Sequence, residues 1–185
     1  MENEIKGLTT WTLDKSHSEI HFRIRHLMIS WVSGFFTDFD GRFEYSDESQ
    51  GQISAGLTIR VDSISTGNAN RDEHLRSIDF FDSGKFPEIQ FESDLLNLAE
   101  AGVQKLPGQL CIHGITRQVM MDVEFSGMAR DPWGNEKIGF SISGEINRRD
   151  FNIHWNTALE SGGVLIGEEV QIRAELQLVK NLQAG

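Results

Sequence analysis

Apolar and polar residues alternate along most of this chain, in runs long enough to define strands. In residues 19–25, Ile20, Phe22 and Ile24 fall on one face, while charged residues and a histidine occupy the other. This period of two is typical of a half-buried β-strand. The alternation predicts eight principal strands, over residues 19–25, 35–45, 53–61, 89–91, 110–112, 119–125, 138–146 and 170–178.

The predicted strands are long and most connections between them are short. Several strands run to about ten residues, against a usual five or six, and Pro132 and Gly134 supply turn residues in one connection. Most connections lack a helical crossover, so we expect antiparallel neighbours. Such strands bury their apolar faces by closing into a barrel or by packing two sheets together. The alternation leaves both open, and strand length favours a closed up-and-down barrel as a single domain, residues 1–185.

One segment, "NANRDEHLRSIDFFDSGKFP" (residues 68–87), interrupts the alternation. It predicts a short amphipathic helix over about residues 71–81, because Asn70 and Glu73 resemble a helix-capping pair. Gly84 can adopt the left-handed conformation that ends a helix, and Pro87 disfavours helix immediately before it. The apolar residues expected to pack against the barrel are Leu75, Ile78, Phe80 and Phe81.

Two roles for this helix remain open. It is either a plug that completes the core at one end of the barrel or a lid over an opening, with Arg71 and Arg76 beside the entrance. A helix this short is marginal in water, so both roles require its apolar face to pack. A second irregular segment, residues 148–169, begins charged and becomes Gly-rich, and we expect it to connect the last two strands.

Charge and composition limit the partners and the compartment. The formal net charge of −11 disfavours nucleic-acid binding and docking on an anionic membrane. Cys111 is the only cysteine, so no intrachain disulfide can form. No window reaches the roughly 20 apolar residues of a spanning helix, and residues 1–10 lack the apolar core of a signal peptide. We therefore expect a soluble cytoplasmic protein without stable membrane insertion.

The histidines do not form an evident metal site. His17 and His21 share a strand face, but His26 has the opposite parity to His21. Cys111 and His113 also share a face, yet two ligands are fewer than a zinc site needs. We expect most histidines to be structural and no metal or other cofactor to be bound.

Nucleophilic catalysis finds equally little support. The segment "DKSHS" brings Asp14, Ser16 and His17 close in sequence, but neighbouring residues of a strand point apart and cannot relay a proton. A G-x-S-x-G elbow, a P-loop and a G-x-G-x-x-G motif are all absent from the sequence. The sequence therefore does not predict an enzyme.

The barrel interior offers another function. An eight-stranded barrel is either just filled by side chains or able to hold one small ligand. Twelve phenylalanines favour a filled interior, whereas small residues on or near inward faces favour space, namely Gly41, Ala55, Gly114, Gly144 and Ala174. An apolar lumen would accept a hydrocarbon chain, because burial of each CH₂ contributes about 0.8 kcal/mol, or about 4 kcal/mol for a five-carbon unit.

The order and spacing of six segments resemble the YceI-like proteins over nearly the whole chain. The matching segments are "WTLDKSHSEIHFRIRHL", "VSGFFTDFDGRF", "SISTGNANRDEHLRSIDFFDSGKFPEIQFES", "GQLCIHGITRQV", "INRRDFNIHWN" and "GVLIGEEVQI". The resemblance implies an extended lipocalin-type antiparallel barrel that holds a polyisoprenoid chain, often as a dimer, and a binding role rather than a catalytic one. Many relatives carry a secretory leader, and residues 1–10 do not resemble one, so periplasmic roles are not transferred.

The resemblance also marks individual positions. These are Asp14, His17, Ser18, His26, Arg71, Asp72, His74, Leu75, Phe80, Phe81, Gly114, Thr116, Arg148, Asp150 and Phe151. We expect their polar members mainly to fix the rim and the helix, with Asp14 and Arg148 as a buried ion pair and Gly114 in a tight turn. Contact with a ligand head group is the alternative, and the rim residues assigned to it are His17, Arg71, His74, Arg76 and Arg148.

The apolar faces supply the predicted ligand surface. Its residues are Phe22, Ile24, Phe39, Phe43, Leu57, Ile59, Leu75, Ile78, Phe81, Phe91, Val123, Phe140, Ile142 and Ile172. The sequence thus predicts a carrier, sequestering protein or sensor for a polyisoprenoid or similar long-chain amphiphile, as a homodimer. The alternatives are a metal-dependent or other enzyme that uses rim His and Asp residues, and a stress-related structural dimer with a packed interior.

Overall fold

The computed structural model describes residues 8–46, 51–93, 96–158 and 164–181. The prediction that residues 1–10 are not a signal peptide concerns mostly residues outside these ranges. Residues 159–163 of the expected 148–169 connection also lie outside them. None of the helices in the described ranges is long and apolar enough to cross a bilayer.

The described chain is mostly β-structure. Its strands are β1 (Leu8–Leu13), β2 (Glu19–His26), β3 (Ser30–Phe36), β4 (Phe39–Ser46), β5 (Gln52–Arg60), β6 (Ile64–Ser65), β7 (Glu88–Ser93), β8 (Leu96–Asn97), β9 (Val103–Ile112), β10 (Ile115–Arg130), β11 (Glu136–Asn147) and β12 (Ile166–Lys180). Its helical elements are the 3₁₀ turns η1 (Lys15–His17), η3 (Val61–Ser63) and η4 (Arg148–Phe151), and the α-helix α1 (Ala69–Arg76).

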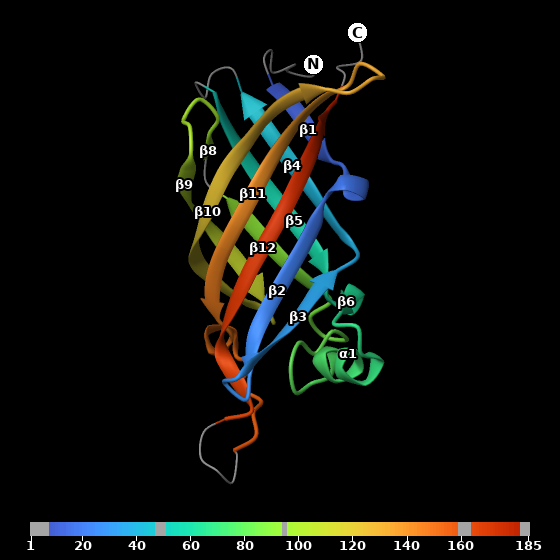
Figure 1. Cartoon of the computed structure of the whole chain (residues 1–185), viewed down its shortest axis with the longest axis vertical. Coiled ribbons are helices and arrows are strands. Elements are labelled where there is room, and N and C mark those ends of the chain that lie inside the picture. The colour runs from blue at the N-terminus through green and yellow to red at the C-terminus, as the bar shows by residue number, and fades with distance from the viewer. Residues whose placement is uncertain (1–7, 47–50, 94–95, 159–163, 182–185) are drawn as a thin grey trace, which may run out of the picture.

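The strands form a closed antiparallel barrel, as the sequence predicts. Around the barrel the order is β1, β4, β5, β7, β9, β10, β11 and β12, and β12 pairs with β1 to close the ring. At its other end β12 pairs with β2, which pairs with β3. Thus β1 and β2 share one position in the barrel, and β3 and β4 share the next. Figure 1 shows the tilted strands as an elongated barrel, with α1 beside the end where β2 meets β3.

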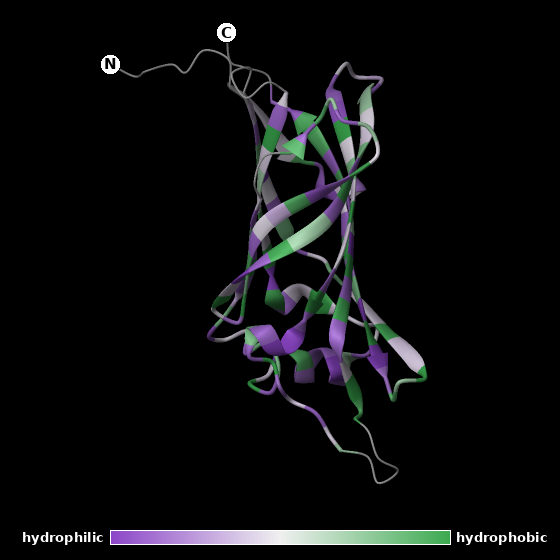
Figure 2. Ribbon diagram, turned by 90° about the vertical axis from the view of Figure 1, so that its left-hand side faces the viewer, coloured by the Kyte–Doolittle hydropathy of each residue, from purple (hydrophilic) through white to green (hydrophobic). Residues whose placement is uncertain are grey.

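The alternation along the strands is the reason that the barrel forms. Apolar and polar residues succeed each other along the ribbons in Figure 2, so that each strand presents one face to the interior. In β9 the burial alternates with a period of two, so that Leu106, Leu110 and Ile112 are buried and Lys105 and Gln109 are exposed. Closing the sheet buries all of these faces at once and pairs its edges.

The prediction of one continuous strand over residues 35–45 is wrong. The run 35–45 is broken after Phe36, because the backbone N–H of Thr37 donates to the carbonyl of Ser63 instead of to a neighbouring strand. The break moves the side-chain parity by one position. Phe36 is buried, whereas Phe35, which would share the inward face of Phe39 and Phe43 in an unbroken strand, is 40% exposed.

Helix α1 is shorter than predicted and begins earlier. It covers Ala69–Arg76 rather than residues 71–81, and its N-cap is Asn68, whose Oδ1 accepts the N–H of Arg71 at 3.0 Å, rather than Asn70. Asp72 in the first turn is buried, and its Oδ1 accepts both the N–H and the hydroxyl of Thr66. These contacts tie the start of the helix to the strand that precedes it.

The end of α1 corrects two further predictions. Ser77 after the helix is extended, and the chain turns away, so Ile78 is 80% exposed instead of packed against the barrel. The left-handed residue of this segment is Asp82, with φ of 46°, rather than Gly84. Phe80 is buried and Phe81 packs against the core, as the sequence predicts.

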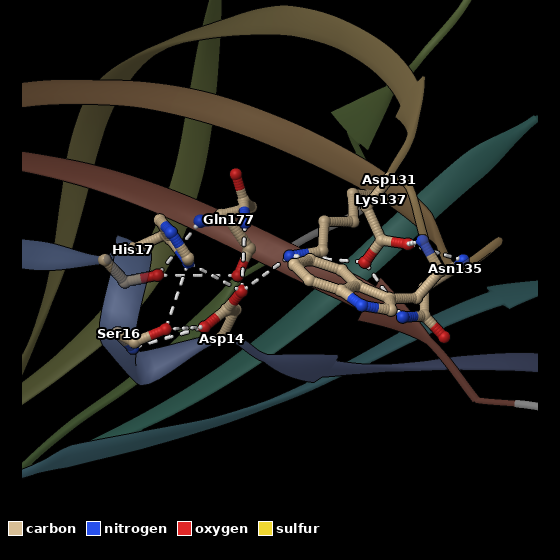
Figure 3. A network of polar contacts seen from close by, with 9 residues as sticks. Asp14, Ser16, His17, Asp131, Asn135, Lys137 and Gln177 are labelled. Carbon is tan, nitrogen blue, oxygen red and sulfur yellow. Dashed lines mark hydrogen bonds and ion pairs between the residues drawn. The ribbon is translucent and has the colours of Figure 1, made fainter.

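A polar network fastens the barrel at the end away from α1 (Figure 3). Asp14, the last residue before η1, accepts hydrogen bonds from Ser16 Oγ at 2.6 Å, Lys137 Nζ at 2.9 Å and Gln177 Nε2 at 2.9 Å. Lys137 belongs to β11 and Gln177 to β12, so one carboxylate joins three strands at the point where the barrel closes. The second carboxylate facing Lys137 is Asp131, at 3.8 Å.

The network makes the barrel sensitive to acid. Partial burial alone raises the pKa of Asp14, but hydrogen bonds from Ser16, Lys137, His17 and Gln177 outweigh it and hold that pKa well below its usual range. Because the folded pKa lies below the unfolded value of about 3.9, the carboxylate contributes stability above that value. The contribution is lost as the pH falls from there through the folded pKa.

We therefore expect Asp14→Asn to lower the free energy of unfolding by about 3 kcal/mol near pH 7, since it weakens several charge-assisted hydrogen bonds. The measurement is chemical denaturation from pH 7 to pH 3, and the difference from the unmodified protein should shrink below about pH 4. Asp38→Asn is the control. Asp38 is exposed and its contact with Lys15 is long, at 3.9 Å, so the substitution should lower the free energy of unfolding by less than about 1 kcal/mol. Equal effects of the two substitutions would contradict the role of the network.

Candidate ligand-binding cavity

An apolar cavity of about 500 Å³ occupies the half of the barrel that carries α1. This volume lies within the roughly 300–1,000 Å³ of small-molecule sites. Its walls come from the inward faces of β2, β3, β5, β7, β9, β10, β11 and β12, and residues of α1 and η4 lie at its end. Asn70 and Arg71 line it and are also solvent-exposed, so the cavity reaches the surface beside α1.

The cavity ends midway along the barrel because side chains fill the other half. On β11, Ile142 lines the cavity, and the next inward residue, Phe140, is buried. On β12, Leu176 lines it, and the next inward residue, Leu178, is 0% exposed. The sequence does not decide between a filled and a hollow interior. In the structure, side chains fill one half of the barrel and the other half is hollow.

Two glycines leave room for aromatic rings in the walls of the cavity. Phe22 of β2 lies opposite Gly34 of β3, and its ring occupies the space that a Cβ at Gly34 would take. Phe91 of β7 uses Gly108 of β9 in the same way. Both rings line the cavity, and they lean across the sheet because glycine leaves room there.

Aromatic rings close one side of the cavity at the α1 end. His74 packs edge-on against Phe80 and Trp155, with ring centroids 5.0 and 4.8 Å apart, and Phe80 and Trp155 are 5.1 Å apart. The Nε2 atom of His74 is 2.9 Å from Oδ2 of Asp79. The cluster joins α1 to the segment after η4, so two parts of the chain far apart in sequence form this end together.

Arg148 is the buried polar group of the cavity. Its side chain is 4% exposed, and it donates from Nε to the carbonyl of Gly167 and from Nη1 to those of Ile153 and Trp155, at 2.8–2.9 Å. Its Nη2 is buried without a hydrogen-bond partner. Desolvation lowers the pKa of Arg148, as does the neighbouring charge of Arg149.

The predicted ion pair between Asp14 and Arg148 is wrong. Asp14 pairs with Lys137 near the start of β11, whereas Arg148 follows the end of β11. The two sites are therefore separated by the length of this strand, about 35 Å at 3.3 Å per residue.

The other predicted site residues divide between the two halves. Those that line the cavity are Phe22, Ile24, Leu57, Ile59, Leu75, Phe81, Phe91, Ile142, Ile172, Arg71, His74 and Arg148. The structure corrects the placement of Phe39, Phe43, Val123 and Phe140, which are buried in the core and do not line the cavity, and of Ile78, which faces solvent.

Two predicted rim residues also lie elsewhere. Arg76 does not line the cavity, and it donates to the carbonyls of Asp62 and Ile64, which fastens α1 to the preceding segment. His17 belongs to the polar network at the opposite end, where its Nδ1 is 3.0 Å from Asp14 Oδ2.

Several cavity residues were not in the predicted set. From the strands they include Ile20, Phe36, Ile89, Leu110, Ile112, Met121, Ile146, Ala174 and Leu176, and from the irregular segment Phe151, Ile153 and Trp155. The parity of the strands could have found most of the first group, because they share faces with predicted residues. The second group also alternates, because exposed Asn152 and His154 lie between Phe151, Ile153 and Trp155. This run covers only five residues in a segment expected to be irregular, so its alternation is a weak signal.

The geometry of the candidate catalytic groups does not form a proton relay. Contrary to the prediction for "DKSHS", turn η1 brings Asp14, Ser16 and His17 together. However, the same nitrogen of His17, Nδ1, lies 3.0 Å from both Ser16 Oγ and Asp14 Oδ2, whereas a Ser–His–Asp relay uses the two ring nitrogens separately. In the described ranges, His, Cys, Asp and Glu side chains do not gather in a group of three that could hold a metal ion.

The fold and the cavity together define a closed, lipocalin-like antiparallel barrel with an apolar lumen in one half. The chain belongs to the YceI-like domain family, which it matches over residues 11–178. It is 39% identical over 171 residues to the UPF0312 protein SA2479 of Staphylococcus aureus, with 92% of this chain and 97% of the relative covered.

Solved structures share the fold. The Campylobacter jejuni YCEI protein is 30% identical, with a TM-score of 0.72 over 91% of this chain and 96% of that one. Burkholderia cenocepacia BcnA has a TM-score of 0.75 at 23% identity, over 89% and 98% of the two chains. A polyisoprenoid binding domain from Saccharophagus degradans has a TM-score of 0.66 at 17% identity, over 92% and 98%. The last two show the fold alone.

The glycine contacts give a direct test of the hollow half. Gly34→Val should push the Phe22 ring into the lumen and weaken binding of the apolar fluorescent probe N-phenyl-1-naphthylamine about tenfold, or by about 1.4 kcal/mol. Ser33→Val, an outward-facing neighbour on the same strand, should leave the affinity unchanged. Fluorescence titration measures both. If a folded Gly34→Val variant binds the probe as tightly as the unmodified protein, Gly34 is not what keeps the Phe22 ring out of the lumen.

Proposed function

We propose that this protein binds and carries a polyisoprenoid or a similar long-chain amphiphile in the hollow half of its barrel, without covalent chemistry. The observation that carries the proposal is the shape and lining of the cavity. It is one continuous volume of about 500 Å³ within the barrel, and its walls are almost entirely aliphatic and aromatic. A chain of repeating apolar units matches such walls, because hydrophobic contact is non-directional and grows with the area buried.

The depth of the cavity supports a chain rather than a compact ligand. Lining residues run along β12 from Ile166 near α1 to Leu176 near the floor. These positions are ten residues apart, about 33 Å along the strand, and the cavity is shorter than this along the barrel axis because the strands of a barrel are tilted. An extended hydrocarbon of several isoprene units fits this shape better than a globular molecule does.

The family supports the same proposal. One solved relative is described as a polyisoprenoid binding domain, and its barrel has the same architecture as this one. The two alternatives find less support in the structure. An enzyme that used Asp14 and His17 would need them within the cavity, whereas they lie at the opposite end of the barrel. The histidines that border the cavity, His21, His26 and His74, do not belong to a group of three metal-ligating side chains within the described residues. A fully packed structural protein would not contain the cavity.

Native mass spectrometry of freshly purified protein, followed by organic extraction, tests the proposal. We expect a mass increment that disappears on extraction, and a binding stoichiometry of one when the extracted protein is titrated with a C20 isoprenoid alcohol. Stoichiometric metal in place of a lipid would favour the enzyme. A ligand-free protein that also refuses the alcohol would contradict the proposal.

A blocked lumen gives an independent prediction. Leu57→Trp places an indole among the lining residues of β5, and we expect it to lower uptake of the alcohol at least about tenfold, equivalent to about 1.4 kcal/mol. Thr58→Trp is the matched control, because the next residue of a strand faces outward. Circular dichroism verifies that both variants fold. Equal uptake by the two variants would place the binding site outside this part of the lumen.

A further inference from the structure

The turn between β2 and β3 exposes three consecutive apolar residues. Met28 and Ile29 are 59% and 81% exposed, and Leu27 before them is exposed as well. The turn lies at the end of the barrel that carries α1 (Figure 1). Contiguous exposed apolar side chains commonly mark a contact with a partner or a membrane. Residues 27–29, the apolar tip, are therefore a candidate docking surface.

The backbone of the apolar tip favours other residue types. Leu27 and Met28 have φ of 52° and 59°, and the N–H of Ile29 donates to the carbonyl of His26, as in a type I′ turn. Such a turn prefers asparagine or glycine at its two central positions, because most other residues are disfavoured at positive φ. The apolar side chains are present despite this turn geometry, which indicates a role for them other than folding.

Positive charge adjoins the apolar tip. Residues 20–36 include two arginines and two histidines but no aspartate or glutamate, although the whole chain has a net charge of −11. The guanidinium groups of Arg25 and Arg23 stack on Trp31, at 4.1 and 4.6 Å from the ring centroid. Arg23 also donates to the neutral amide of Gln171, so these contacts leave both charges unneutralised. An apolar tip followed by tryptophan and arginine matches the order of a bilayer surface, from hydrocarbon to phosphate.

The apolar tip is continuous with the wall of the cavity. His26 precedes the tip and lines the cavity, as does Leu165, whose carbonyl accepts the N–H of Leu27 at 2.8 Å. A surface that receives the tip therefore also meets this end of the barrel. A bilayer is such a surface and is where a long-chain amphiphile resides, whereas a second copy of the chain would cover the end at which the ligand enters.

We propose that the apolar tip, Trp31 and the two arginines dock the protein reversibly on a lipid bilayer, with the α1 end of the barrel facing the lipid. The tip enters the apolar part of the bilayer, and Arg23 and Arg25 contact lipid phosphates. Because the net charge of −11 opposes an anionic leaflet, the bilayer is one with a zwitterionic surface. The choice of a bilayer rests on the proposed function, but docking itself requires no ligand in the lumen.

Sedimentation with phosphatidylcholine vesicles tests the proposal on the full chain without added ligand. The unmodified protein should sediment with the vesicles. Leu27→Asn combined with Met28→Gly gives the turn its preferred residues, so this double variant should fold at least as stably as the unmodified protein. Its affinity for the vesicles should fall at least about tenfold, because two apolar side chains no longer enter the bilayer. Ile29→Glu is an independent variant and should also weaken vesicle binding.

Trp133→Ser is the control, because Trp133 is 82% exposed in the turn between β10 and β11, at the opposite end of the barrel. It should leave vesicle binding unchanged. An unmodified protein that does not sediment with the vesicles, or folded tip variants that bind as well as it does, would overturn the inference. So would tip variants that dissociate a homodimer in size-exclusion chromatography with light scattering, since the tip would then contact a second copy. These outcomes leave the proposed function standing, because uptake of the isoprenoid alcohol from solution tests it separately.

Discussion

The closure of the barrel by β12 is the constraint on which the rest of the structure depends. This strand pairs with β11 along almost its whole length, with β2 at one end and with β1 at the other. Its inward residues line the cavity as far as Leu176 and fill the core from Leu178. A single strand therefore sets the register of both halves. A slip by one residue would turn its apolar face outward in both, so the packed half stabilises the register that the hollow half requires.

This division explains how a barrel with an internal cavity stays stable. A cavity costs free energy because its walls lose packing contacts. The packed half buries Phe43, Phe140 and Ile138, and the network of Asp14 joins three strands in the same half. The hollow half is held by those strands continuing into it and by α1 and η4 at its end. Stability and ligand binding are therefore carried by different parts of one sheet.

The sequence predicted the architecture well because alternation is a local signal that also defines the global fold. It could not predict the cavity, since parity shows which side chains point inward but not whether they meet across the barrel. Phe140 and Ile142 have the same parity, yet one fills the core and the other lines the cavity. The break after Phe36 depends on a hydrogen bond from Thr37 to Ser63, which only the folded chain specifies. The cap at Asn68 is a local hydrogen bond from the N–H of Arg71, three residues on, and Asn70 offers the same side chain two positions later, so the local pattern does not distinguish the two asparagines.

The charges on the surface and those beside the lumen have different physical reach. Exposed acidic groups act on an approaching anion through salt solution, where charges are screened beyond about 10 Å at 0.1 M ionic strength. Arg148 is buried beside the cavity, where screening is weaker. The net charge of −11 therefore says little about the electrostatic field inside the lumen.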